Sequence, residues 1–325
     1  GGNALKSTTT GGANTALGYA ALESNTTAAN NTAVGYSALT ANTTGGTNTA
    51  LGAEALLRNT TGSDNTAVGV NPMTDNTTGT NNVAVGKRAL KSNTTASSNT
   101  AVGYHSLEEN TTGENNASLG ATSLTANTTG SSNTAIGMNA LRDNTTASNN
   151  TAVGLNSLLV NTTGATNTAV GGSAMSANTT GGTNTAIGQS ALGSNTTASN
   201  NVAVGFNALG ANTTGGSNTA VGRLSLDACT TGGNNVALGD SAGGANTTGE
   251  KNTFLGKSAG AGVTTGGENT LVGNICADDL VDGNTNTIIG YNMSMSNTGT
   301  DAAIAIGSNI AAPSSNKVRI GVANG

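Results

Sequence analysis

Large and charged side chains are scarce in this sequence. Aromatic residues make up 2% of the 325 residues, tryptophan is absent, and charged residues make up 8%. Such a composition cannot supply the thick apolar core of an ordinary globular domain, so any core must be thin. It also lacks a convergent set of acids, bases and nucleophiles, and we therefore predict that the protein is not an enzyme.

Clustered positive charge and long apolar runs are missing as well. The chain has 11 Lys and Arg residues against 16 Asp and Glu, for a net charge of −5, and its basic residues are dispersed. A nucleic-acid partner is not expected, because nucleic acids are bound through clustered basic residues. No apolar run approaches the roughly 18 residues of a membrane-spanning helix, so no membrane insertion by this segment is expected. Because the chain starts at Gly1 without a methionine or signal sequence, we expect a segment of a longer array or a processed product.

Residues suited to catalysis or metal binding are few and scattered. His105 is the only histidine, and its repeat position holds various residues in other copies, so we expect it to have a surface role. The acidic pairs Glu108–Glu109 and Asp278–Asp279 are expected in exposed turns. Neither Cys-x-x-Cys spacing nor an Asp-x-Asp-x-Asp loop occurs. The sequence therefore predicts no metal site and no cofactor.

The two cysteines, Cys229 and Cys276, occupy different repeat positions almost three periods apart. If each period is one turn of a solenoid, they are separated by about 14 Å along its axis, at ~4.7–4.9 Å per turn. That distance is too long for a disulfide within one chain. We expect two small buried residues, with an interchain disulfide as the alternative.

One phrase, Asn-Thr-Ala-Val-Gly in its commonest form, returns along the chain with a strict 17-residue period. A strict short period predicts one structural unit stacked on copies of itself. The glycine that ends the phrase is never replaced, which predicts a positive φ or a neighbour too close for a Cβ atom. This invariant glycine column includes Gly18, Gly35, Gly52, Gly69, Gly86 and Gly103.

Residues 31–47 form one complete repeat. Its β-branched Thr and Val residues favour extended structure, and Asn-Thr-Thr-Gly favours a turn. Seventeen residues are too few for a helix, a strand and two connections, so we predict two short extended segments joined by turns. The predicted fold is an all-β parallel β-solenoid with 17-residue coils. We divide it into a repeat shaft, 1–307, and a C-terminal coil of the 14-residue type, 308–325, that leads into a further segment.

Two sets of apolar positions alternate across the predicted strand. Thr32 and Val34 should face one side of it and Ala33 the other. The Ala position gains volume in three late repeats, where the upstream Leu position loses volume, so these two columns should share one core. The late exchange pairs Phe254, Leu271 and Ile288 with Gly243, Gly260 and Ala277. The predicted core columns include Val34, Leu39, Val102, Leu107, Phe254, Leu271 and Ile288.

The column of Val34 defines a second apolar surface on a slender coil. Burial of one Leu and one Val per coil does not match the conformational entropy lost by ordering a whole coil. Covering the second surface with other chains would supply the difference. We therefore predict a homo-oligomer in which one apolar face is intramolecular and the other intermolecular.

Two further repeat columns suggest surface roles. Each Asn-Thr-Thr is a formal N-glycosylation acceptor, although a stacked asparagine ladder in the turns explains the spacing equally. The position after the invariant glycine varies widely and includes exposed aromatics that could touch a glycan or a neighbouring fibre. The candidate glycosylation sites include Asn25, Asn42 and Asn59, and the candidate contact residues are Tyr19, Tyr36, Tyr104 and Phe206.

The repeat resembles that of a known family. Asn201-Val202-Ala203-Val204-Gly205 and Ala303-Ile304-Ala305-Ile306-Gly307 are similar to the Val-Ala-Ile-Gly repeats in the heads of trimeric autotransporter adhesins. That resemblance implies a left-handed parallel β-roll and a homotrimer. The family has a 14-residue repeat, whereas the repeat of this chain is enlarged at Asn-Thr-Thr, until Gly307 and Gly321 return to the shorter spacing.

The sequence also resembles tail-fibre-like proteins of bacteria, phages and giant viruses that carry Asn-Thr-Ala-Val-Gly-Tyr-x-Ala-Leu runs. In many of these, a segment like 316–321 leads towards a C-terminal trimerisation region. Both resemblances imply an extracellular, cell-surface or virion-surface location. We predict a stiff structural fibre or adhesin shaft whose partners are its own copies and a host-surface glycan or protein. The alternatives are a self-assembling filament built by end-to-end stacking, and a glycan- or ice-binding solenoid.

Overall fold

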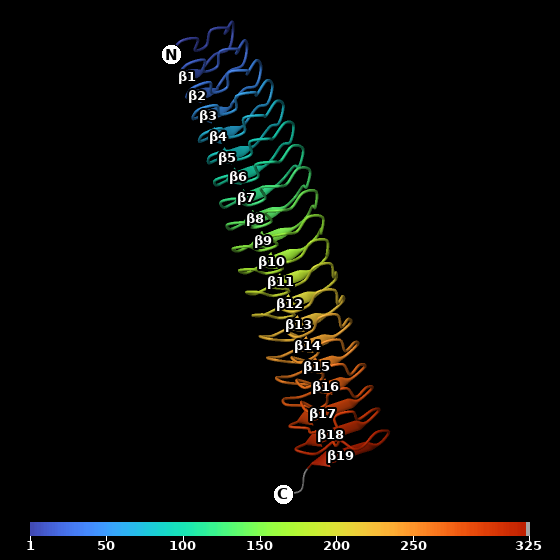
Figure 1. The fold of residues 1–325 in the computed structure, drawn as a ribbon. Coiled ribbons are helices and arrows are strands. Elements are labelled where there is room, and N and C mark those ends of the chain that lie inside the picture. The colour runs from blue at the N-terminus through green and yellow to red at the C-terminus, as the bar shows by residue number, and fades with distance from the viewer. Residues whose placement is uncertain (323–325) are drawn as a thin grey trace. The chain divides into compact units, whose positions relative to one another are not determined.

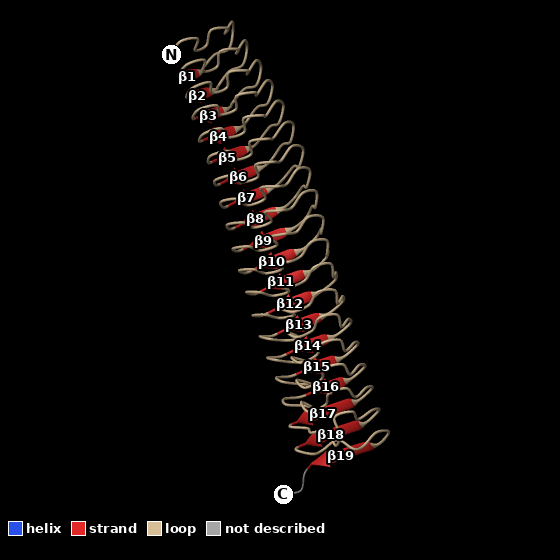
Figure 2. Cartoon of the chain, viewed as in Figure 1, coloured by secondary structure: helices blue, strands red, loops and turns tan. Residues whose placement is uncertain are grey.

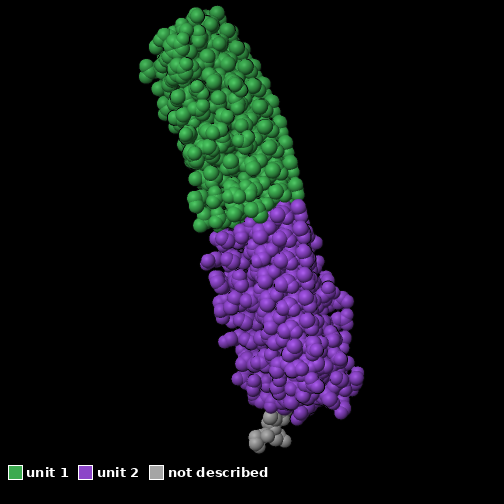
Figure 3. Space-filling view, viewed as in Figure 1, with its two compact units in different colours: residues 1–165 green, residues 166–325 purple. Residues whose placement is uncertain are grey.

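A computed structural model describes residues 1–322. Residues 323–325, the end of the predicted C-terminal coil, lie outside the described residues. The chain divides into two compact units, residues 1–165 and residues 166–325 (Figure 3). Across the described part of the chain, regular structure consists of strands and contains no helix (Figure 2). Each unit is a parallel β-solenoid, which confirms the predicted fold class.

Strands recur once per coil in both units (Figure 1). Unit 1 contains β1 (Thr15–Leu17), β2 (Thr32–Val34), β3 (Thr49–Leu51), β4 (Thr66–Val68), β5 (Val83–Val85), β6 (Thr100–Val102), β7 (Ala117–Leu119), β8 (Thr134–Ile136) and β9 (Thr151–Val153). Unit 2 contains β10 (Thr168–Val170), β11 (Thr185–Ile187), β12 (Val202–Val204), β13 (Thr219–Val221), β14 (Val236–Leu238), β15 (Thr253–Leu255), β16 (Thr270–Val272), β17 (Thr287–Tyr291), β18 (Ile304–Ser308) and β19 (Val318–Val322).

Neighbouring strands pair in parallel, and the register follows the repeat. Ala33 of β2 lies beside Ala50 of β3, for example, so equivalent residues stack in columns. The period shortens at the last pair, where Ile304 of β18 lies beside Val318 of β19. The 14-residue spacing seen in the sequence is therefore the register of β18 and β19.

The second extended segment predicted for each coil is not a strand. Ser37 and Leu39 both have positive φ angles, of 55° and 52°, and equivalent residues repeat this conformation along the chain. Left-handed residues at every second position bend the backbone away from the extended conformation of a strand. Coils still join here by hydrogen bonds, since the Leu39 amide donates to the Ala55 carbonyl at 3.0 Å. Burial of the Leu side chain offsets the strain of the left-handed conformation.

The core of each coil is narrow and lies between the strand and this bent segment. Ala33 and Leu39 are fully buried, as are Leu107, Leu271 and Ile288. Phe254 is also buried, and Cβ atoms built on Gly243 and Gly260 would lie 2.5 Å and 2.4 Å from its ring. The two glycines thus leave the space that the aromatic ring occupies. Val34 and Val102 are only half-buried and belong to the outer side of the strands.

The invariant glycines have both properties that their column predicted. From Gly18 to Gly290 their φ angles lie in a positive range that side chains rarely adopt, for example +142° at Gly18 and +141° at Gly103. A Cβ atom on Gly103 would also lie 2.4 Å from the carbonyl oxygen of Gly120 in the next coil. Gly35, Gly52, Gly69 and Gly86 make the same close approach. Strain and contact together exclude any side chain from this column.

Candidate interaction surfaces

The outer side of the strands is an uncharged surface in each unit. From β1 to β18 the middle residue of the repeated phrase points inward and its two neighbours point outward, as the half-buried, buried, half-buried pattern of β2 shows. These two outward positions hold threonine and aliphatic residues, with no Asp, Glu, Lys or Arg from β1 to β19. Ile136 of unit 1 remains 42% exposed and Leu238 of unit 2 47% exposed. We call this surface the strand face.

Aromatic residues stand beside the strand face, in the position after the invariant glycine. Tyr19, Tyr36, Tyr104 and Phe206 are all exposed. The rings of Tyr19 and Tyr36 stack at 5.7 Å between centroids with an interplanar angle of 12°. The ring of Tyr104 lies 3.8 Å from that of His105. These side chains are accessible to a partner, and each of these three tyrosine rings also contacts a neighbour within the chain.

A buried asparagine ladder connects the coils at the Asn-Thr-Thr turns. Asn59 donates from Nδ2 to the Asn42 Oδ1 atom at 2.8 Å and to the Gly62 carbonyl at 2.9 Å. Its own Oδ1 atom accepts from Asn76 Nδ2 at 2.7 Å. The asparagine therefore uses both ends of its amide, and the side chain fixes the turn as well as the stacking of coils.

Sequence reasoning missed a second asparagine ladder, formed by the first residue of the repeated phrase. Asn31 Oδ1 accepts from the Asn48 backbone amide at 2.8 Å, and Asn31 Nδ2 donates to the Gly45 carbonyl at 3.0 Å. The same carbonyl accepts from Asn42 Nδ2 at 2.9 Å. The two ladders thus converge on one backbone oxygen in this coil. The near-invariance of this asparagine was the signal that could have revealed it.

Replacing Asn59 by aspartate tests the turn ladder, because the change keeps the shape and removes both donors. The carboxylate would face two acceptors in a buried site, so its pKa in the folded state should rise above the ordinary value. The penalty is then small below about pH 3.9 and grows as the pH increases, reaching about 3–5 kcal/mol of the free energy of unfolding at pH 7. Chemical denaturation at several pH values measures it. The control is Asn81→Asp, at an exposed position where another coil carries Asp64; equal losses in the two variants would contradict the ladder.

The ladder also bears on the candidate glycosylation sites. Asn25, Asn42 and Asn59 are fully buried, and the Nδ2 atom that would carry a glycan is a hydrogen-bond donor in each of them. A glycan on this nitrogen would displace the ladder and would not fit between stacked coils. The folded structure therefore opposes modification at these positions.

His105 belongs to a charged cluster that sequence reasoning did not assemble. Its Nδ1 atom contacts Glu108 Oε2, and Arg88 of the preceding coil pairs with Glu108 Oε1. The Glu108 side chain is buried, so the prediction of an exposed turn was wrong for this residue. The error has a physical cause, because Arg88 pairs with one oxygen of the buried carboxylate and the His105 ring contacts the other. Glu109 is exposed as predicted.

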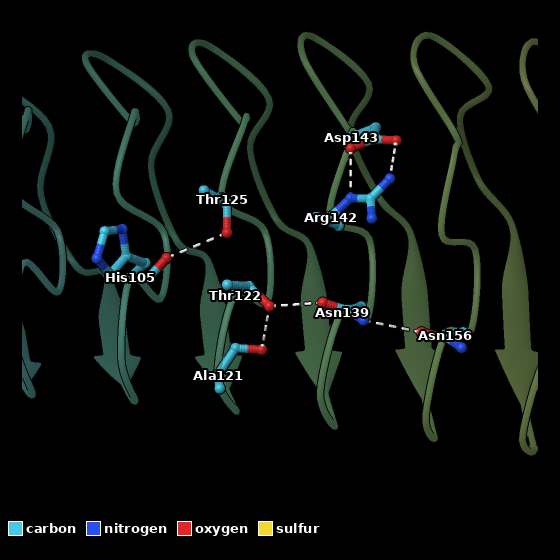
Figure 4. A network of polar contacts seen from close by, with 8 residues as sticks. All are labelled: His105, Ala121, Thr122, Thr125, Asn139, Arg142, Asp143 and Asn156. Carbon is cyan, nitrogen blue, oxygen red and sulfur yellow. Dashed lines mark hydrogen bonds and ion pairs between the residues drawn. The ribbon is translucent and has the colours of Figure 1, made fainter.

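Neighbouring coils are also joined by polar contacts outside the core (Figure 4). Thr122 Oγ1 donates to Asn139 Oδ1 at 2.6 Å, and Asn139 Nδ2 donates to Asn156 Oδ1 at 3.0 Å. These three residues occupy the repeat column of His105, so polar residues there have a structural use. In the same region, Thr125 Oγ1 donates to the His105 carbonyl at 3.1 Å. Figure 4 also shows the pairing of Arg142 with Asp143 within one coil.

The second acidic pair, Asp278 and Asp279, is exposed as predicted. Asp279 accepts from the Met295 amide at 2.8 Å and 3.0 Å, one distance for each carboxylate oxygen. Partial desolvation raises the pKa of Asp279. In residues 1–322, no group of three His, Cys, Asp or Glu side chains gathers as a metal site would require.

Both cysteines are buried and free, which confirms the prediction of two small interior residues. Burial raises the pKa of the Cys229 thiol to about 11 and that of Cys276 to about 12. Thiols with such values remain protonated and react slowly at neutral pH.

The two threonines of Asn-Thr-Thr have different roles. The first donates to the next coil, as Thr43 Oγ1 does to the Thr60 carbonyl at 3.0 Å. The second is exposed in every coil from Thr10 to Thr265. One exposed row of threonines therefore runs along each unit.

No protein-family model matches the chain, and no curated protein matches its sequence. Among residues 1–322, there is no helix with the length and apolar character to cross a membrane.

Proposed function

We propose that this protein is a structural fibre or adhesin shaft, carried on a cell surface or a virion, that associates with copies of itself. The observation that carries the proposal is the strand face, where outward threonine and aliphatic columns continue through each unit without a charge. Exposed apolar surface of this extent in a regular array is typical of an interaction surface. Its partner of first choice is the same face of another copy, since both then lose apolar surface to water.

The resemblance to trimeric adhesin heads and tail-fibre-like proteins supports three copies and a left-handed roll. Within each unit, coil-to-coil hydrogen bonds and buried asparagine ladders supply the rigidity that a shaft needs. The cluster of His105, Glu108 and Arg88 is accounted for by mutual pairing, in keeping with a protein that is not an enzyme. A glycan or protein on a host surface would meet the exposed aromatic column first.

Two neighbouring residues of unit 1 give a matched test of the strand face. Ile136 lies on it, whereas Met138, 51% exposed, lies in the variable column that already contains Lys87 and Lys257. Ile136→Lys should weaken association by about 100-fold or more, because an ammonium would be buried without a partner. Met138→Lys should leave association unchanged. Sedimentation equilibrium over a range of concentrations measures the mass of each variant.

Sedimentation equilibrium of the unmodified chain tests self-association itself. We expect the unmodified chain to sediment as a trimer and to form discrete particles in electron micrographs. A well-ordered monomer at high dilution would contradict self-association, and equal effects of the two lysines would place the contact elsewhere. The ice- or glycan-binding alternative rests on the exposed threonine row and predicts binding by the monomer.

A further inference from the structure

The asparagine ladder of the Asn-Thr-Thr turns is interrupted within unit 2. In every coil from Asn25 to Asn212 this column holds asparagine. The coils that follow have, in the same column, Cys229, Asn246, Val263 and Leu280. The Cys229 thiol keeps the contact within its own turn, since Sγ donates to the Gly232 carbonyl at 3.4 Å. It has no amide with which to reach the coil before it, so the ladder stops at Asn212.

The interruption leaves two buried oxygen atoms without a donor. In the intact ladder each Oδ1 atom accepts from the asparagine one coil later, as Asn195 does from Asn212 Nδ2 at 3.0 Å. Cys229 stands one coil after Asn212, and Val263 stands one coil after Asn246. Among the described residues, Asn212 Oδ1 and Asn246 Oδ1 are accordingly buried with no hydrogen-bond partner. Such an oxygen atom binds water once the turn opens, which favours opening at these two junctions.

The junction after Cys229 also has weaker backbone support. Here the Ala228 amide donates to the Gly244 carbonyl at 3.3 Å, whereas the equivalent bond one coil earlier measures 3.0 Å. The later coil has Gly243 at the position where the earlier one has the buried side chain of Leu226. Glycine gains more backbone freedom than leucine when a segment opens. A lost ladder contact and weaker backbone support thus coincide at one junction.

We infer that the Asn-Thr-Thr side of unit 2 opens locally at residues 227–249, while the strands of the same coils stay paired. β13 and β14 keep the regular register there, with Ala220 beside Ala237. The second asparagine ladder continues through these coils, because Asn218 Oδ1 accepts from the Asn235 amide at 2.9 Å. Opening is therefore confined to the side of the coil where the first ladder ends. A local opening of this kind requires less free energy than unfolding of the whole chain.

Cys229 supplies an internal probe of this opening. Its thiol is fully buried and burial raises its pKa to about 11, so reaction at neutral pH requires the open form. Cys276 is equally buried, and its Sγ atom donates to the Ile288 carbonyl at 3.3 Å in a coil outside the opening segment. In the folded chain we expect iodoacetamide to alkylate Cys229 faster than Cys276, by about ten-fold or more. Mass spectrometry of the digested protein gives both rates.

The variant that tests the cause is Cys229→Asn. The introduced amide can donate to Asn212 Oδ1 and accept from Asn246 Nδ2, which joins the ladder again. We expect amide hydrogen exchange in the turn 229–232 to slow by about ten-fold or more, because a buried oxygen atom regains its donor. Cys229→Ala removes the thiol without restoring a donor, so it should not slow exchange. Mass spectrometry follows the exchange, and circular dichroism checks that each variant is folded.

Val263→Asn is a matched control in the same column. It would give Asn246 Oδ1 a donor, but the next residue of the column is the apolar Leu280, which cannot donate to the new oxygen. The change therefore moves the unpaired atom one coil onward. Exchange in the turn 229–232 should remain as in the unmodified chain.

Three results would overturn the inference. Equal protection of the turn 229–232 and of the turn at Asn195 in the unmodified chain would show that the end of the ladder does not weaken its coil. Equal alkylation rates of the two cysteines would mean that the chain opens only as a whole. Slowing of exchange by Cys229→Ala as large as that by Cys229→Asn would exclude the ladder as the cause. These readouts concern a single chain, whereas sedimentation measures the proposed self-association, so the two can fail separately.

Discussion

Replacing Gly171 by alanine is expected to lower the free energy of unfolding by about 3–5 kcal/mol. Gly171 has a φ angle of +135°, a conformation that a residue with a Cβ atom adopts only at a cost. The new methyl group would also lie 2.5 Å from the Gly188 carbonyl oxygen in the next coil. Backbone on both sides prevents relief of the contact without separation of the coils.

The adjacent residue supplies the control. A Cβ atom on Gly172 would have no heavy atom within 4 Å, and the φ angle there is not in the strained range. Gly172→Ala should therefore change stability by less than about 1 kcal/mol, and reduced freedom of the unfolded chain favours a small gain. Thermal and chemical denaturation measure both variants, and hydrogen exchange of the amides around 171–190 locates the damage. Similar melting curves for the two alanine variants would refute the close-approach explanation.

The glycine column, the register and the fold class were predictable because they depend on a period. A residue that recurs once per 17-residue coil must meet its own copy, so Gly103 approaches Gly120 and Ala33 lies beside Ala50. Comparison of the repeats with one another also revealed the exchange between Phe254 and Gly243, since both changes occur in the same coil. Repetition here replaces the information that an alignment of related proteins would provide.

Features that depend on backbone conformation or on long side chains were not predictable in this way. Leu39 adopts a left-handed conformation that its residue type disfavours, so propensity argued for a strand where the structure has a bend. Glu108 is buried because Arg88 and His105 contact its carboxylate. A cluster that occurs only once produces no periodic pattern in the sequence.

The candidate surfaces also include one feature that the repeat predicts and one that it does not. The two-sided pattern of Thr32, Ala33 and Val34 predicted an outward apolar surface, and the structure leaves that side of β2 half-buried. The number of copies that cover it depends on the angle between faces of different chains, which a period within one chain does not specify. The sequence therefore predicts the strand face as a surface, whereas the number of copies that cover it is not predictable from the repeat.

Removing the ring of Phe254 is expected to have the second large effect on stability. The side chain is fully buried, and Phe254→Ala should lower the free energy of unfolding by about 3–5 kcal/mol through lost burial and the cavity that remains. Gly243→Leu alone should also destabilise the chain, by about 1–3 kcal/mol or more, because a Cβ atom there would lie 2.5 Å from the Phe254 ring.

The double variant is expected to be more stable than Phe254→Ala alone, by about 1–2 kcal/mol, because the new leucine fills the space that the ring vacates. Position 243 has a φ angle of +59°, close to the +49° of Leu226 one coil earlier, so its backbone already suits the leucine of the repeat. A double-mutant cycle from chemical denaturation gives the coupling between the two sites. Additive losses would mean that the ring and the glycine do not share one space. Recovery of stability in the double variant would show that the combined volume of the two columns specifies this core. The repeat can therefore exchange volume between these two columns, whereas the column of Gly171 tolerates no replacement of glycine.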